Sequence, residues 1–276
     1  MVGCYGKAVF LMEAFIRECK LCYRYEKNDA EDAPTILFLH GWGCDGSIFA
    51  AFEKDLLNHA SILTVDFPGH GKSGEPKDTW GVPDFAEQIR ELLELNEIRR
   101  VHIVAHSFGG RIAIYLASHY PQLIDKIVIT GGAGIRKPAA ESHSKKQLQY
   151  KRLKKMVACL DNIPFLKGIA ARLQEMLVQK YGSADYKRLN VSMRKTFVKV
   201  INQDLSEMLS QIKASTLLVW GSNDTDTPLW MAQKMEKEIP DAGLAVFEGR
   251  SHFAFVEESQ RFLIILKTFF FGGNIA

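Results

Sequence analysis

The chain has 276 residues, of which 47% are hydrophobic and 24% charged, a composition typical of a globular domain with a large core. Its formal net charge of +3, from 35 Lys and Arg against 32 Asp and Glu, gives no case for nucleic-acid binding. No uninterrupted apolar stretch reaches the length of about 18 residues that a membrane-spanning helix needs, so no transmembrane segment is expected.

The five cysteines are an odd number and are spread thinly, which is not the pattern of a disulfide framework. Together with an N-terminal stretch that lacks the basic region of a signal peptide, this favours a cytoplasmic location. Cys19 and Cys22 have the spacing of a redox or zinc pair. They fall in a strand-like stretch, where residues three apart point to opposite faces, and no second pair accompanies them, so no metal site is expected.

Short apolar runs recur along the chain and predict the strands of a sheet. Residues 13–27 read as one or two antiparallel edge strands. The runs that follow are nearly continuous in apolar residues, which is typical of strands covered on both faces. These runs are Thr35–Leu39, Ser61–Val65, Val101–Ala105, Lys126–Thr130, Thr216–Trp220 and Leu244–Phe247.

Helical patterns alternate with these strands. Residues 84–95 place Phe85, Ile89 and Leu92 on one face, and residues 108–120 are apolar nearly all round. A further helix is expected over 262–271. Strand–helix alternation of this kind predicts an α/β fold with a doubly wound, mostly parallel sheet.

The alternation stops between Gly134 and Ser210. This segment has helical stretches but no convincing strand, and it carries 16 Lys and Arg against 6 Asp and Glu, a net charge of +10. The rest of the chain carries 19 against 26, a net charge of −7. We therefore expect a helical insertion over 134–210 in a core formed by 1–133 and 211–276. Its charge is consistent with an ordinary solvated surface or with an acidic partner.

Two segments resemble phosphate-binding loops. Residues 41–46 fit the pattern G-x-G-x-x-G after a strand, with Asp66 20 residues beyond Gly46, as in a dinucleotide site. Residues 66–73 nearly fit a P-loop, but their first position is Asp66 instead of Gly, and a carboxylate there opposes phosphate binding. The second motif is rejected, and the first competes with the motif described next.

The sequence Ala105-His-Ser107-Phe-Gly109 lies at a strand end with a helix following it. A nucleophile on such a tight turn needs small residues two places before and after, because the backbone doubles back. Ala105 replaces the first Gly of the pattern G-x-S-x-G. The turn projects the hydroxyl of Ser107 clear of the sheet near the positive end of the helix dipole.

A serine nucleophile needs a base, and the base needs an acid to orient it. Asp224 follows the predicted strand that ends at Trp220, and His252 follows the one that ends at Phe247. Loops at the carboxyl ends of parallel strands line one crevice, so Ser107, Asp224 and His252 are expected to converge. Asp226 is the alternative acid.

These motifs in the order Ser, Asp, His make the sequence similar to the serine-type α/β-hydrolases. The resemblance covers nearly the whole chain, from His40-Gly-Trp42-Gly through the serine turn to Ser251-His252, and explains residues 41–46 as an oxyanion loop. It implies that the backbone N–H groups of Trp42 and Phe108 form the oxyanion hole. It further implies that 134–210 is a helical cap.

The resemblance implies a hydrolase that cleaves a carboxylic ester of a small-molecule acyl substrate, without a metal or organic cofactor. One alternative is a carbon–carbon bond hydrolase of the same fold. Those enzymes usually carry Trp after the catalytic His, where this chain has Phe253. Another alternative is a ligand sensor that retains the triad. Phe253 and Phe255 themselves are expected to be core residues of the last helix.

Overall fold

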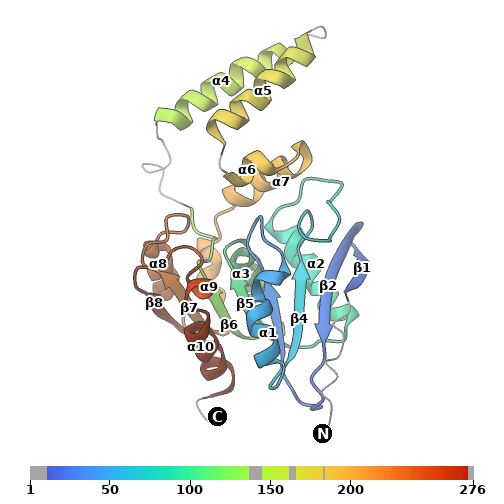
Figure 1. Cartoon of the computed structure of the whole chain (residues 1–276), viewed down its shortest axis with the longest axis vertical. Coiled ribbons are helices and arrows are strands. Elements are labelled where there is room, and N and C mark those ends of the chain that lie inside the picture. Colours follow the sequence, from blue (N-terminus) through green and yellow to red (C-terminus); the bar gives the residue numbers. More distant parts are fainter. Residues whose placement is uncertain (1–10, 137–144, 162–165, 183, 273–276) are drawn as a thin grey trace. The chain divides into compact units, whose positions relative to one another are not determined.

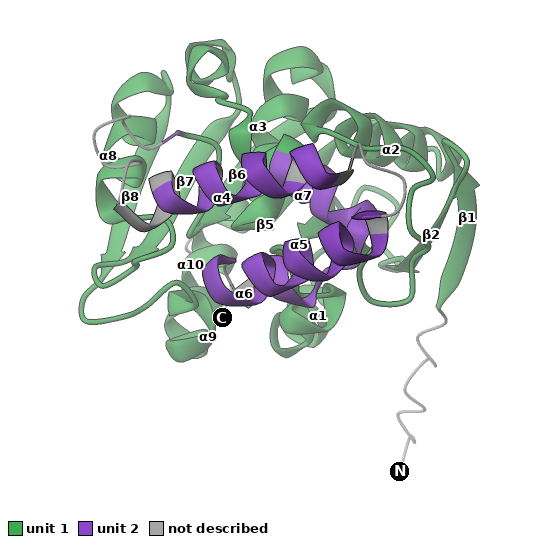
Figure 2. Ribbon diagram, turned by 90° about the horizontal axis from the view of Figure 1, so that it is seen from above, with its two compact units in different colours: residues 1–135, 199–276 green, residues 136–198 purple. Residues whose placement is uncertain are grey.

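The structure is a computed structural model that describes residues 11–136, 145–161, 166–182 and 184–272. The chain divides into two compact units, which Figure 2 distinguishes by colour. The first unit comprises residues 1–135 and 199–276, and the second comprises residues 136–198. Residues 199–210, which the sequence analysis assigned to the insertion, thus group with the sheet.

The described part of the first unit forms an eight-stranded sheet in the order β1-β2-β4-β3-β5-β6-β7-β8 (Figure 1). β2 pairs in antiparallel fashion with both β1 and β4, and the six strands β3 to β8 pair in parallel. The predicted mostly parallel sheet and its antiparallel edge are confirmed. The strands are β1 (Met12–Ile16), β2 (Cys19–Glu26), β3 (Thr35–Leu39), β4 (Ser61–Asp66), β5 (Val101–His106), β6 (Ile124–Thr130), β7 (Ser215–Gly221) and β8 (Ala242–Phe247).

Helices cover both faces of this sheet, because the central strands bury side chains on both sides. One core joins α2, α3 and α8 to residues such as Leu37 and Ile103, and the other joins α1, α9 and α10 to Ile36 and Val104. The helices of this unit are η1 (Gly46–Phe49), α1 (Ala50–Leu56), α2 (Val82–Leu95), α3 (Phe108–His119), η2 (Pro121–Leu123), η4 (Ser206–Gln211), α8 (Leu229–Glu238), α9 (Ala254–Glu257) and α10 (Ser259–Phe271).

The second unit contains helices and no strand among its described residues. Its elements are α4 (Lys145–Asp161), α5 (Lys167–Tyr181), α6 (Ala184–Arg188) and α7 (Val191–Asn202), the last of which continues into the first unit. Across the described residues of both units, no helix combines the length and apolar content needed to cross a bilayer.

The register of the parallel strands brings five chain turns to one edge of the sheet. Leu39 of β3 pairs with Ala105 of β5, which pairs with Ile129 of β6. Further along the sheet, Gly221 at the end of β7 pairs with Phe247 at the end of β8. The segments that follow β3, β5, β6, β7 and β8 therefore start side by side.

His102 of β5 gives the fold a pH-dependent stability. Its ring is 4% exposed and stacks on Phe270 with 4.8 Å between centroids and 3° between planes. Its Nδ1 lies 3.3 Å from Oδ2 of Asp125. Burial lowers the pKa of His102 to about 4 from an ordinary 6.5, although Asp125 opposes this. Between these two pH values the unfolded chain binds a proton that the folded chain does not, so acidification favours unfolding.

We expect His102 to contribute a loss of roughly 2 kcal/mol in unfolding free energy as pH falls from 6.5 to 4. His102→Phe keeps an aromatic ring against Phe270 and cannot titrate. Urea unfolding of both proteins across this range should show that the unfolding free energy of the variant rises relative to that of the parent as pH falls. A stability difference that is constant with pH would contradict the assignment.

Candidate active site

Ser107 lies at a sharp turn between β5 and α3. Its backbone has φ 49° and ψ −107°, a region that residues other than glycine rarely occupy. Its N–H donates to the carbonyl of Thr130 at 3.1 Å, and its own carbonyl accepts from Ala133 at 2.9 Å. These bonds to the segment after β6 hold the strained turn in place.

The small residue at position 109 is required by close approach of the backbone. A Cβ on Gly109 would lie 2.1 Å from the carbonyl oxygen of Leu39, well inside van der Waals contact. The N–H of Gly109 instead donates to the carbonyl of His40 at 3.1 Å. The second small residue of the Ser107 motif therefore lets α3 start directly against the end of β3.

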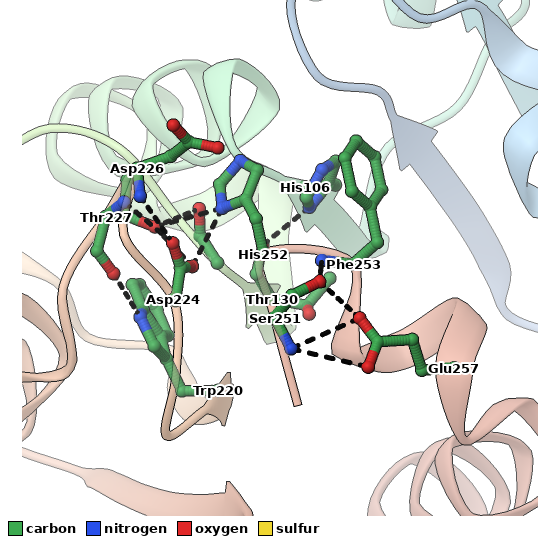
Figure 3. Close-up of polar contacts among 11 residues, drawn as sticks. His106, Thr130, Trp220, Asp224, Asp226, Thr227, Ser251, His252, Phe253 and Glu257 are labelled. Atoms are coloured by element: carbon green, nitrogen blue, oxygen red, sulfur yellow. Dashed lines mark hydrogen bonds and ion pairs between the residues drawn. The ribbon is translucent and has the colours of Figure 1, made fainter. Parts of the chain in front are cut away.

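Asp224 and His252 are brought together from the segments after β7 and β8. Nδ1 of His252 lies 2.7 Å from Oδ2 of Asp224, as drawn in Figure 3. The carboxylate can only accept, so Nδ1 carries the hydrogen and Nε2 is left as the basic nitrogen of the neutral ring. The side chain of Asp224 is fully buried and that of His252 is 11% exposed.

The carboxylate of Asp224 accepts four hydrogen bonds. Oδ1 accepts the N–H groups of Asp226 and Thr227, each at 2.9 Å. Oδ2 accepts the Oγ1 hydroxyl of Thr227 at 2.8 Å besides the ring of His252. Burial alone would raise the pKa of Asp224, but the bonds from His252 and Thr227 hold it below its ordinary value. The group is therefore a carboxylate at neutral pH.

Asp226, the alternative acid, is exposed. Its N–H donates to Asp224, so its backbone supports the other carboxylate. One carboxylate oxygen each of Asp224 and Asp226 and one ring nitrogen of His252 lie within 4.8 Å of one another, a spacing at which they could ligate a metal ion. Each oxygen of Asp224 already accepts hydrogen bonds from two groups, however, and a metal ion would have to displace some of them. The arrangement fits an acid–base pair better than a metal centre.

Ser107 and His252 both contact the chain segment at the end of β6. The segment from Thr130 to Ala133 is bonded to Ser107 at both ends. A Cβ on Gly131, whose φ is +53°, would lie 3.0 Å from Nδ1 of His252, so the imidazole packs directly on this backbone. The ring centroids of His106 and His252 are 4.8 Å apart, so the residue before Ser107 also contacts the segment that follows β8.

The residues expected to form the oxyanion hole lie next to Ser107. A Cβ on Gly41 would lie 3.2 Å from Cβ of Ser107, so the loop that carries Trp42 passes beside it. The ring of Trp42 packs on that of Phe108 at 5.2 Å. Phe108 is the first residue of α3, so its N–H lacks an acceptor within the helix and lies at the positive end of its dipole.

Two further histidines hold the surrounding backbone. Burial lowers the pKa of both His40 and His106 to about 3, so both rings are neutral. His106 donates from Nδ1 to the carbonyl of Thr130 at 3.0 Å. His40 donates from Nδ1 to the carbonyl of Gly41 at 2.7 Å and accepts at Nε2 from the N–H of Phe67 at 2.9 Å.

Two residues near the pair differ from the sequence analysis. Phe255 is fully buried as expected, but Phe253 is 38% exposed and lies against His106 with 5.0 Å between ring centroids. Placing Phe253 in the core was therefore wrong, because it precedes α9 and follows His252 along the edge of the site. Thr227 was missed, and its position three residues after Asp224 in a turn was the available signal.

Comparison with known proteins gives a consistent picture. A family model described as alpha/beta hydrolase fold matches residues 34–259. The chain is 29% identical over 254 residues to a 2-hydroxy-6-oxononadienedioate/2-hydroxy-6-oxononatrienedioate hydrolase of Paraburkholderia phymatum, covering 85% of this chain and 86% of the relative. It is 26% identical over 271 residues to an uncharacterized protein of Mycobacterium tuberculosis, covering 90% and 78%.

A solved structure, that of a hydrolase from Pseudomonas aeruginosa PA01, superimposes with a TM-score of 0.72 at 24% identity and covers 95% of this chain and 99% of that one. At that identity the likeness concerns the fold.

Proposed function

We propose that this chain, which belongs to the alpha/beta hydrolase fold family, is a serine hydrolase that uses Ser107, His252 and Asp224 as its triad. The observation that carries the proposal is the 2.7 Å contact between His252 and a buried carboxylate, on the same backbone segment that anchors the strained turn of Ser107. Such a pair leaves a basic imidazole nitrogen that can take the proton of a serine hydroxyl.

The proposed reaction is acyl transfer to water. Oγ of Ser107 attacks the substrate carbonyl while Nε2 of His252 takes its proton, and Asp224 stabilises the imidazolium that forms. The N–H groups of Trp42 and Phe108 bind the oxyanion of the tetrahedral intermediate. The leaving group takes the proton from His252, and water then releases the acid from Ser107 by the same steps.

A carboxylic ester of a small-molecule acyl substrate is the bond we propose for cleavage. A second candidate, carbon–carbon bond hydrolysis, is favoured by the activity for which the Paraburkholderia relative is named. Phe253 follows His252 where such enzymes usually have Trp, which favours the ester. Steady-state assays of an ester panel and of 2-hydroxy-6-oxo-dienoates, on the same preparation, separate the two. Fluorophosphonate labelling of Ser107 without steady turnover of either substrate class would favour a ligand sensor.

Labelling with a fluorophosphonate tests the nucleophile directly. The probe phosphonylates an activated serine, and peptide mapping should find it on Ser107 alone. Modification at another serine, or none in folded protein, would overturn the proposal.

Four cysteines are described, Cys19, Cys22, Cys44 and Cys159, and all are free thiols. They support the proposal of a reducing, cytoplasmic location.

Thr227 is proposed as a positioning residue for the triad. Its hydroxyl lies 2.8 Å from Asp224 Oδ2, 3.0 Å from the carbonyl of Gly131 and 3.3 Å from Nδ1 of His252. Its single proton can satisfy one of the first two oxygens at a time. The hydroxyl therefore lies between the acid and the backbone on which the imidazole packs, and it positions Asp224 when it donates to Oδ2.

We expect Thr227→Val to lower kcat by about 10–100-fold with little change in KM, because a hydrogen bond to a charged group is lost. Thr227→Ser keeps the hydroxyl and should retain most of the activity. Equal losses in both variants would show that the methyl group, and not the hydroxyl, matters.

A further inference from the structure

The second unit contains a two-helix hairpin that is open on its outer sides. α4 and α5 pack against each other, and the rings of Tyr150 and Tyr181 lie 5.7 Å apart, so the start of one helix meets the end of the other. Val157, Ala170 and Val178 are buried. We call the line along which α4 and α5 pack, where Tyr150 meets Tyr181, the seam of the hairpin.

α5 carries a stripe of four exposed residues away from this seam. Ile169, Arg172, Met176 and Lys180 follow one another at spacings of three, four and four residues, so they share one face of the helix. Ile169 is 55% exposed and Met176 is 60% exposed. We call these four residues the basic–apolar stripe. Apolar side chains alternate with cations along it.

α4 presents the same combination. Met156 is 66% exposed, and the neighbouring Arg152 and Lys155 are exposed as well. Of the thirteen large apolar side chains exposed among the described residues, five belong to residues 136–198, which are less than a quarter of the chain. Exposed large apolar side chains are therefore denser in this unit than in the rest of the described chain.

The charge of the hairpin is one-sided. Residues 145–181 contain nine Lys and Arg against Asp161 and Glu175, a net charge of +7. Glu175 lies on α5 but is paired with Arg194, which donates to its two carboxylate oxygens at 2.6 and 3.1 Å. It therefore does not offset the cations of the stripe.

We propose that the basic–apolar stripe, with Met156 and its basic neighbours, docks the protein on an anionic lipid surface. Helices that lie in a membrane interface combine Lys and Arg at the headgroups with apolar side chains in the acyl boundary. A helix face with separate apolar side chains suits a lipid surface, which adapts to it, better than a protein partner, which would need a matching groove. This association is peripheral and independent of the reaction at Ser107.

The test is partition of the full-length protein onto vesicles. Vesicles of phosphatidylcholine with phosphatidylglycerol should bind the protein, vesicles of phosphatidylcholine alone should bind it weakly, and rising salt should release it. Arg172→Gln/Lys180→Gln and Ile169→Ser/Met176→Ser should each lower the partition coefficient by about 10-fold or more. Ile264→Ser and Lys237→Gln, which change exposed residues of the sheet unit, are the matched controls and should not lower it.

Hydrolysis of a soluble ester, measured on the same variants, separates this proposal from the triad. We expect it to be unchanged in the stripe variants, whatever its absolute rate. No partition onto anionic vesicles, or equal partition of stripe and control variants, would overturn the lipid surface. A raised KM for the soluble ester in Ile169→Ser/Met176→Ser, with vesicle binding unchanged, would also overturn it and assign these side chains to the substrate site.

Discussion

Ser107→Ala is expected to lower kcat/KM for an ester by at least about 10⁵-fold and to abolish fluorophosphonate labelling. The loss is this large because triad residues act as a unit, so that removing the nucleophile leaves only the oxyanion donors and substrate binding. His252→Ala should be as severe. Both are measured in single-turnover assays, in which slow residual hydrolysis is still visible.

Stability provides the control for this experiment, because the backbone of Ser107 is strained. Alanine has a Cβ like serine, so Ser107→Ala should leave the unfolding free energy within about 0.5 kcal/mol of the parent. Glycine adopts φ 49° readily, and Ser107→Gly should be about 1 kcal/mol more stable and equally inactive. A Ser107→Ala protein destabilised well beyond this range would show that the hydroxyl supports the fold, and a destabilised Ser107→Gly protein would contradict the strain argued for this turn.

The sheet could be predicted because each parallel strand is a short, nearly continuous run of apolar residues. The run Thr35–Leu39 is apolar throughout and is buried at every position in β3, and the other runs lie within two residues of the observed strand starts. Placement of Asp224 and His252 followed, since both come directly after a strand and parallel strands end at one edge. Their contact therefore follows from the topology of the sheet.

Other features depend on tertiary contacts that leave no periodic signal. Phe253 reads as core by composition, but its position after His252 at the start of a short helix leaves it exposed. The hydroxyl of Thr227 reaches Gly131, 96 residues away, and no local pattern reports such a contact. The compact helical unit ends at Val198, and η4, in which Leu209 is fully buried, contacts α3 of the sheet unit.

Asp224→Asn against Asp226→Asn is the substitution pair that identifies the acid of the triad. Asn at 224 keeps the shape of the side chain but presents an amide that can direct an N–H toward the imidazole, which disfavours the tautomer with a basic Nε2. We expect kcat to fall by about 10⁴-fold. Asp226→Asn makes the same chemical change two residues away, on an exposed side chain whose backbone N–H, not its carboxylate, contacts Asp224.

Activity within about threefold of the parent is expected for Asp226→Asn, since an exposed carboxylate acts on the site only through a screened charge. The pH profile adds a second readout. The profile of Asp226→Asn should overlay that of the parent. An inactive Asp226→Asn protein together with an active Asp224→Asn protein would show that Asp226 is the acid of the triad. The buried carboxylate of Asp224, which accepts four hydrogen bonds, would then serve only to hold the loop in place.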